Sequence, residues 1–301
     1  MGPTALKACA ITVNLLFYIF GGDKLWDASK FTAVDDRVRG GSSESFLVPV
    51  DGGRSVTFQG TLDTKTLGGA GFASQRTEVI DDQGKPLNLT GAASLRLTVK
   101  VPDAIDQPPL AAGNAGPGSD QGVEPEGGKY YAINLHDDPA AAQPEGRRNS
   151  SVEFKYVFQV PSHSEDIKGN GYSGATRSHR PVSSAGALLV IDAPLHDFKP
   201  YYRGRPLGQP TPNDPSGADA ISEITQMPPG SDNSAQVTFK DTTSAADPPQ
   251  LRLDQIYTVD FMMASYFDRQ SGPFALQIVS VAAVATPDDR RPPVHSMCAI
   301  F

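Results

Sequence analysis

Short segments in which apolar and polar residues alternate follow one another along the chain, and this period of two predicts β-strands. The clearest runs from Leu95 to Val101. Expected strands cover residues 11–20, 45–50, 55–60, 72–80, 95–101, 129–135, 152–160, 188–192, 257–267 and 274–284. No segment shows the period of an amphipathic helix. Many short strands joined by Gly- and Pro-containing turns favour an all-β fold, a β-sandwich or jelly roll.

Three stretches poor in large apolar residues interrupt this pattern and are expected to be loop insertions. They cover about residues 102–128, 163–181 and 206–250, and residues 287–301 form a C-terminal tail. The third is broken by a short strand-like run at 235–239. The 29 glycines and 26 prolines fit this amount of loop, while 39% hydrophobic residues still provide a core. We therefore expect residues 1–301 to form a single β-sandwich domain with long insertions.

Charge and the chain's first segment restrict the partners and the compartment. A formal net charge of −8 with scattered basic residues argues against nucleic acid as a partner. The apolar stretch from Ala8 to Phe20 is too short for a membrane span. It also lacks the features of a signal or transit peptide. The sequence predicts an intracellular, cytoplasmic protein and disfavours the mitochondrion. Cys9 and Cys298 are then either free thiols or, if the termini meet, a disulfide pair.

Residues 35–39 hold the densest cluster of opposite charges. Asp35 and Asp36 are followed by Arg37 and Arg39, and then by a Gly-Gly pair. The arginines and carboxylates would fix a polar ligand in a pocket through charge-assisted hydrogen bonds. The alternative is an ion-pair network that holds a tight turn, and we give this structural interpretation about twice the weight.

The remaining polar residues give no recognised catalytic motif, so the catalytic residues are unknown and no cofactor is expected. None of the five histidines has zinc-ligand spacing to another His or Cys, so no metal site is predicted. His136 precedes Asp137 and would be either a general base oriented by a carboxylate or, by default, a solvated loop residue.

Several blocks together resemble the complex I intermediate-associated protein family. They are Asp35-Asp36-Arg37-Val38-Arg39-Gly40-Gly41-Ser42-Ser43, residues 60–63, 67–74 and 198–205, Phe261-Met262-Met263-Ala264-Ser265-Tyr266-Phe267, and residues 272–278. The resemblance implies a galactose-binding-like jelly roll. The best-known members of the family are mitochondrial chaperones that assemble NADH:ubiquinone oxidoreductase. Ala264 stands where the family pattern leads us to expect a basic residue.

Two functions follow as hypotheses. The first is a non-catalytic sandwich that binds a ligand or a partner protein, as the assembly chaperones do. The second is a cofactor-independent cyclase of fungal specialised metabolism, for example of the Diels-Alder type, which would hold a small hydrophobic or polar organic molecule in the jelly roll. The candidates for ligand binding are Asp36, Arg37, Arg39, Gln75, Arg76, Tyr202, Arg203 and Tyr266. In the cyclase hypothesis Arg37, Arg39, Arg76 and Tyr266 would donate hydrogen bonds to a ligand oxygen.

Overall fold

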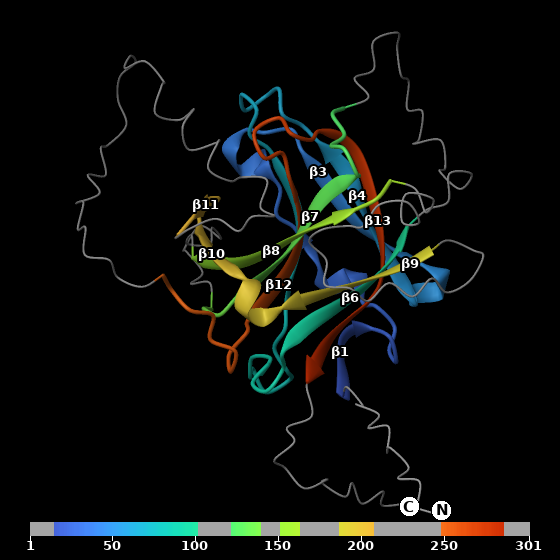
Figure 1. Cartoon of the computed structure of the whole chain (residues 1–301), viewed down its shortest axis with the longest axis vertical. Helices are drawn as coiled ribbons and strands as arrows, with labels where there is room; N and C mark the ends of the chain where they lie inside the picture. Colours follow the sequence, from blue (N-terminus) through green and yellow to red (C-terminus); the bar gives the residue numbers. More distant parts are fainter. Residues whose placement is uncertain (1–14, 102–121, 140–150, 163–186, 208–247, 286–301) are drawn as a thin grey trace, which may run out of the picture.

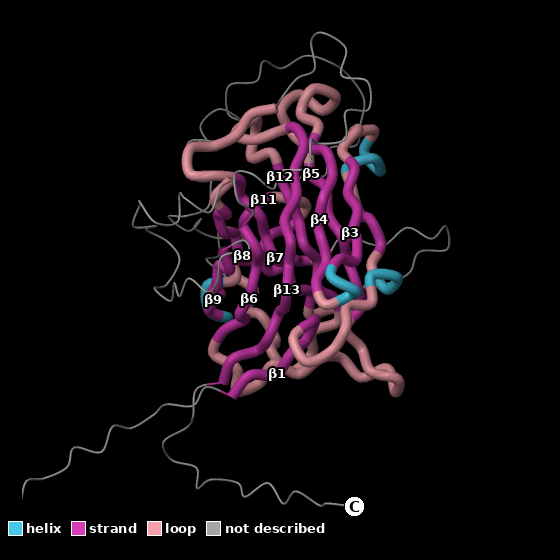
Figure 2. Tube along the Cα trace, turned by 90° about the vertical axis from the view of Figure 1, so that its right-hand side faces the viewer, coloured by secondary structure: helices cyan, strands magenta, loops and turns pink. Residues whose placement is uncertain are grey.

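The computed structural model describes residues 15–101, 122–139, 151–162, 187–207 and 248–285. In these residues two antiparallel β-sheets lie face to face (Figures 1 and 2). The described helical segments are short 3-10 turns: η1 (Ala28–Lys30), η2 (Asp36–Arg39), η3 (Asp51–Gly53) and η4 (Leu195–Asp197). The predicted all-β sandwich is confirmed. No helix in these ranges is long and apolar enough to cross a membrane.

The first sheet, sheet A, has six strands. Its order is β3 (Glu44–Val50), β4 (Ser55–Leu62), β13 (Gly272–Ala285), β6 (Ser94–Val101) and β9 (Ala187–Pro194), and β1 (Leu15–Gly21) also pairs with β13. Strand β13 has 14 residues and therefore serves two neighbours along one edge. Its first half pairs with β4 and its second half with β1.

The second sheet, sheet B, has seven strands. Its order is β11 (Arg205–Pro206), β10 (Lys199–Tyr202), β8 (Val152–Val160), β7 (Lys129–His136), β12 (Thr258–Ala264), β5 (Phe72–Glu78) and β2 (Thr32–Ala33). The central strands β7 and β12 belong to distant parts of the chain and pair from Thr258 opposite His136 to Met262 opposite Ala132.

The core lies between the sheets and takes alternate residues from each strand, as the period of two requires. In β6, Leu95, Leu97 and Val99 are fully buried and belong to the core. The pairing of β13 with β6 shifts register between Ile278 and Ser280, which forms a β-bulge. The carbonyl oxygen of Val279, inside this bulge, accepts a hydrogen bond of 2.9 Å from the indole Nε1 of Trp26.

Most predicted strands lie where they were expected. The structure extends several of them by one or two residues, and β8 has the predicted bounds. The strand predicted at 72–80 is shorter, because β5 ends at Glu78. The prediction was wrong for residues 265–267, because β12 ends at Ala264 and the chain then enters a turn. Residue 206, predicted to begin an insertion, closes strand β11. Several predictions lie outside the described residues: the possible strand at 235–239, the insertion 163–181, residues 102–121 and 208–247 of the other two insertions, the tail, and Cys9 and Cys298.

Candidate functional site

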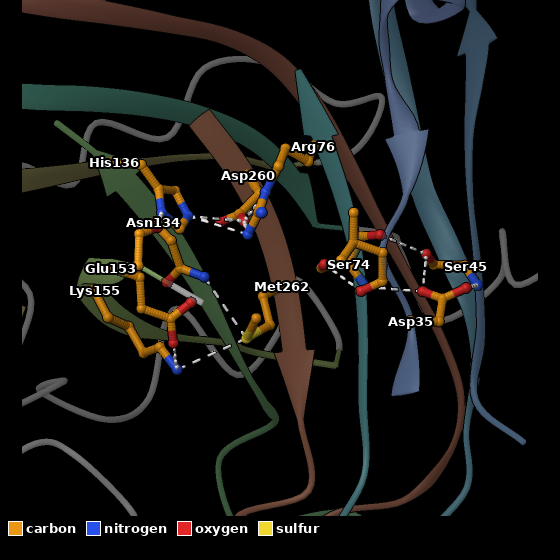
Figure 3. Close-up of polar contacts among 12 residues, drawn as sticks. Asp35, Ser45, Ser74, Arg76, Asn134, His136, Glu153, Lys155, Asp260 and Met262 are labelled. Carbon is orange, nitrogen blue, oxygen red and sulfur yellow. Dashed lines mark hydrogen bonds and ion pairs between the residues drawn. The ribbon is translucent and has the colours of Figure 1, made fainter. Parts of the chain in front are cut away.

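Asp35 ties the two sheets together at one end of the sandwich. Its carboxylate accepts hydrogen bonds from the backbone N–H of Ser45 at 3.1 Å and from the Ser45 hydroxyl at 2.7 Å, both on β3 of sheet A. The same carboxylate accepts the backbone N–H of Ser74, on β5 of sheet B, at 2.9 Å (Figure 3). Gln75 on β5 adds a further bond to β3, since its Nε2 donates to the carbonyl oxygen of Ser45 at 2.9 Å.

Asp36 forms a second link of the same kind. Its carboxylate accepts the Ser43 backbone N–H at 3.0 Å, the Ser43 hydroxyl at 2.7 Å and the Phe72 backbone N–H at 3.2 Å. Asp36 is fully buried. The turn requires glycine here, because a Cβ on Gly41 would lie 2.3 Å from the Asp36 carboxyl carbon. We call Asp35, Asp36, Ser43, Ser45 and Gln75 the Asp–Ser clasp.

The arginines of the same segment lie on the surface. Arg37 donates through Nε to the Ser43 carbonyl oxygen at 3.3 Å and pairs with the carboxylate of Glu44. The guanidinium of Arg39 lies over the Phe72 ring, 5.4 Å from its centre. Between them Val38 is 82% exposed. The two carboxylates thus bond to serines and backbone amides, while the arginines face outward.

A loop of unusual backbone conformation lies beside this segment. Tyr266, Phe267 and Asp268 have φ angles of 48°, 56° and 62°, which is the left-handed region that residues with a side chain rarely occupy. Tyr266 is 8% exposed, with its ring 6.1 Å from that of Tyr130 in an edge-on contact. Phe267 is 54% exposed. Three adjacent residues of this kind store backbone strain that the surrounding structure has to support.

The support comes from both flanks of the loop. The Ser265 hydroxyl donates to the Gly69 carbonyl oxygen at 2.8 Å and accepts the Gly71 N–H at 2.9 Å. Gln270 is fully buried, and its Nε2 donates to the carbonyl oxygens of Ala264 at 2.6 Å and Tyr130 at 2.8 Å. The loop is therefore fixed to β7, to β12 and to the 63–71 loop that precedes β5.

These segments together form one end of the molecule. We call η2, the 63–71 loop and the 265–271 loop the loop end. It lies at the top of Figure 2, opposite the end where β1 lies. The backbone N–H of Phe72 bonds to Asp36, and the Asp268 N–H bonds to the Gly69 carbonyl oxygen at 3.1 Å, so all three segments are in contact.

A separate group of ionisable residues lies on the face of sheet B directed away from the core. Arg76 on β5 is directly opposite Asp260 on β12 and donates to its Oδ2 through Nε at 2.8 Å. The Nη2 of Arg76 also lies 3.1 Å from Nε2 of His136. The same Nε2 lies 3.4 Å from Oδ2 of Asp260, and Nδ1 lies 3.4 Å from the Ser151 hydroxyl oxygen.

Burial and the neighbouring Arg76 have opposite effects on the pKa of Asp260. Burial acts to raise the pKa of this fully buried carboxyl, but the Arg76 guanidinium and the contact with His136 together outweigh it, and the pKa lies below the ordinary value. Asp260 is consequently ionised in the folded protein at neutral pH, as half of an ion pair.

The structure divides the predicted binding residues into separate places. Asp36 and Gln75 lie in the Asp–Ser clasp, and Arg37, Arg39 and Tyr266 lie at the loop end. Arg76 lies on the outward face of sheet B. Tyr202 and Arg203 lie at the end of β10, three strands away from β12. There the Arg203 guanidinium lies 5.3 Å from the centre of the Tyr202 ring.

The residues that surround Arg76 were not among the candidates predicted from the sequence. The strands around them show an apolar or alternating pattern, which drew no attention to Asp260, Asn134 and Lys155. A charged residue within an apolar run is nevertheless a signal, because charged residues are rarely buried without a partner. The default interpretation of His136 as a solvated loop residue was wrong, since it ends β7 and is 5% exposed. Its carboxylate neighbour is Asp260 rather than Asp137, which bonds to Arg252.

Metal ligands do not gather in the residues that the structure describes. Within those ranges no group of three His, Cys, Asp or Glu side chains is arranged to hold an ion.

The fold and these contacts define an all-β sandwich of two antiparallel sheets, closed at one end by a carboxylate–serine clasp. Comparison with known proteins finds one similarity to a family model and one to a relative. Residues 19–104 match the model of complex I intermediate-associated protein 30 (CIA30), which confirms the resemblance found in the sequence. The matched range contains the whole clasp. The chain is also similar to an uncharacterised protein of Schizosaccharomyces pombe, with 28% identity over 274 residues that cover 89% of this chain and 84% of that relative.

Proposed function

We propose that this protein is a non-catalytic binding protein that holds a partner protein at its loop end. The observation that carries the proposal is the exposed Phe267 at the centre of three consecutive left-handed residues. A strained backbone that exposes an aromatic side chain gives no stability in return, so its presence favours a role in recognition. The CIA30 match supports a function in protein association.

The loop end has the features of a preorganised contact surface. Val38 at 82% exposure, Phe267 at 54% and Val123 at 48% are exposed large apolar side chains here, while Leu25 at 64% and Phe17 at 58% are exposed outside the loop end. Val123 is held beside the loop by two hydrogen bonds of 2.9 Å: its backbone N–H donates to the Ser271 hydroxyl oxygen, and its carbonyl oxygen accepts the Ser271 N–H. Because hydrogen bonds already fix the backbone, this chain would lose little conformational entropy when a partner binds.

Affinity capture from cell extract tests the proposal. The full chain is compared with Phe267→Ala and with Phe46→Ala, a matched control because Phe46 is 50% exposed on β3 of sheet A. Phe267→Ala should lose captured proteins that the wild type and Phe46→Ala retain. Equal capture by all three proteins would contradict the proposal.

The identity of the captured proteins decides the finer role. Subunits of NADH:ubiquinone oxidoreductase would support the assembly role of the best-known family members. The expected cytoplasmic location stays part of the proposal, and cell fractionation tests it. The cyclase alternative has its own readout in the same extract, which is a small molecule converted to a new product by the purified protein.

A further inference from the structure

Two arginines stand at a definite spacing before an exposed serine beside the loop end. Arg37 and Arg39 are five and three residues before Ser42, which follows Gly40 and Gly41. Both arginines belong to η2, and their side chains and that of Ser42 are exposed. Arginine-directed protein kinases recognise arginines at these two positions, because carboxylates in the substrate cleft of the kinase bind the guanidinium groups. The segment therefore combines the charges of a kinase substrate with an accessible hydroxyl.

The Ser42 hydroxyl lies at the surface between two segments of the molecule. Its oxygen is 3.1 Å from the hydroxyl oxygen of Thr66, in the 63–71 loop, and both residues are exposed. A hydrogen bond between two exposed hydroxyls contributes little, because each group can bond to water instead. The Ser42 oxygen is thus open to reaction, and a group attached to it would lie between η2 and the 63–71 loop.

Two other serines lack one or the other of these features. Ser43 is fully buried, and its hydroxyl donates to the Asp36 carboxylate at 2.7 Å within the clasp, so an enzyme has no access to it. Ser29 is exposed, but its hydroxyl donates to the Asp27 carboxylate at 2.5 Å, and residues 1–28 contain no arginine. Of the three, Ser42 has both the exposure and the preceding arginines.

Surface contacts alone hold the two guanidinium groups. Arg37 pairs with Glu44, and these side chains are 55% and 45% exposed, so the ion pair is weak and a second carboxylate can replace it. Arg39 contacts the Phe72 ring from the solvent side. Gly40 ends η2 with a φ of 83°, and a Cβ at this position would meet nothing within 4 Å. An enzyme can therefore approach the backbone between Arg39 and Ser42 without disturbing the clasp.

From these features we propose that Ser42 is a phosphorylation site for an arginine-directed protein kinase. The Ser42 oxygen forms a bond to the γ-phosphorus of ATP, the bond from that phosphorus to the bridging oxygen breaks and ADP leaves, and a base of the kinase takes the hydroxyl proton. The phosphate adds a charge of about −1.5 to −2 at neutral pH. Its effect rests on the function proposed above: a partner that covers Val38 would have to displace water from this charge, so phosphorylation weakens partner binding.

A kinase assay with mapping of the modified residue tests this inference. The folded full chain is incubated with Mg-ATP and an arginine-directed kinase that requires both arginines, and its peptides are analysed by mass spectrometry. Ser42 should carry phosphate, whereas Ser43 and Ser29 should not. Arg39→Ala should slow the phosphorylation of Ser42 about tenfold, the effect of losing one charge-assisted hydrogen bond to the kinase. Arg54→Ala, which removes an exposed arginine between β3 and β4, is the matched control and should leave the rate unchanged.

Three results would overturn the inference: no phosphate on Ser42 of the folded chain, phosphate there only after the chain is denatured, or equal rates for Arg39→Ala and the wild type. Affinity capture then compares the phosphorylated chain with Ser42→Ala treated in the same way. The phosphorylated chain should retain less of the partner that Phe267→Ala loses, and equal capture would contradict the effect on binding. Mapping of the phosphate needs no partner, so the modification and the proposed function can fail separately.

Discussion

Ser43 donates twice to Asp36, through its backbone N–H at 3.0 Å and through its hydroxyl at 2.7 Å. Asp36 is fully buried and also accepts the N–H of Phe72. Asp36→Ala would leave these donors buried and unsatisfied, at a cost of about 3 kcal/mol in the free energy of unfolding. Urea denaturation measures this loss. Asp82→Ala, in an exposed turn, is the control and should change the stability by less than about 0.5 kcal/mol.

Trp26 donates a hydrogen bond to the bulge in β13, so its replacement should lower the stability of the fold. Trp26→Phe keeps the stacking on Phe20 but loses the hydrogen bond to the Val279 carbonyl oxygen. We expect a loss of about 2 kcal/mol, measured by urea denaturation. Tyr156→Phe, which loses only a 3.5 Å contact to the Asp192 carbonyl oxygen, should cost less than about 0.5 kcal/mol. Equal losses would mean that the bulge does not depend on the indole.

Asp260 should make stability depend on pH through its ion pair with Arg76. The folded-state pKa of Asp260 lies below the ordinary 3.8, so its contribution is present above that value and is lost as the pH falls below it. Arg76→Met removes the guanidinium that lowers the pKa of Asp260, so this pKa rises relative to the wild type. Because His136 still lowers that pKa in the variant, the folded-state pKa moves toward the ordinary value, and the loss of stability below about pH 4 should be smaller than in the wild type. Urea denaturation between neutral pH and about pH 3 measures the difference, and parallel pH profiles for the two proteins would contradict it.

The strain of the 265–271 loop should be measurable as stability. Phe267→Gly removes the side chain that disfavours a left-handed φ of 56°, and should raise the free energy of unfolding by about 0.5–1 kcal/mol. Phe267→Ala keeps the strain and should not give this gain. A destabilised glycine variant would mean that the aromatic ring contributes to folding and not only to recognition.

The strands were predictable because the alternation of apolar and polar residues in each strand follows which face is buried. In Leu95–Val101 every second residue is apolar, and in the structure each of these is buried. The end of β12 was not predictable in this way. Residues 265–267 continue the apolar run, but hydrogen bonds of Ser265 to Gly69 and Gly71, about 195 residues earlier in the chain, turn the backbone away.

The sequence identified several of the candidate residues, but not the residues to which they bond. The Asp35–Arg39 cluster drew attention through its charges, yet its carboxylates bond to serines rather than to the arginines. Arg76 was also among the candidates, but its partner Asp260 lies 184 positions away and is set by strand pairing. Local sequence carries no record of such pairings, so Asn134 and Lys155 became visible only once the strands were placed side by side.

Site-specific photo-cross-linking at position 267 tests the central claim most directly. A photoreactive phenylalanine analogue is placed at 267 or, as the control, at 46, and the full chain is irradiated in cell extract. If the loop end binds a partner, position 267 should give a discrete cross-linked protein that is absent from position 46. Equal cross-linking patterns from the two positions, or none from 267, would contradict a partner-binding role for the loop end.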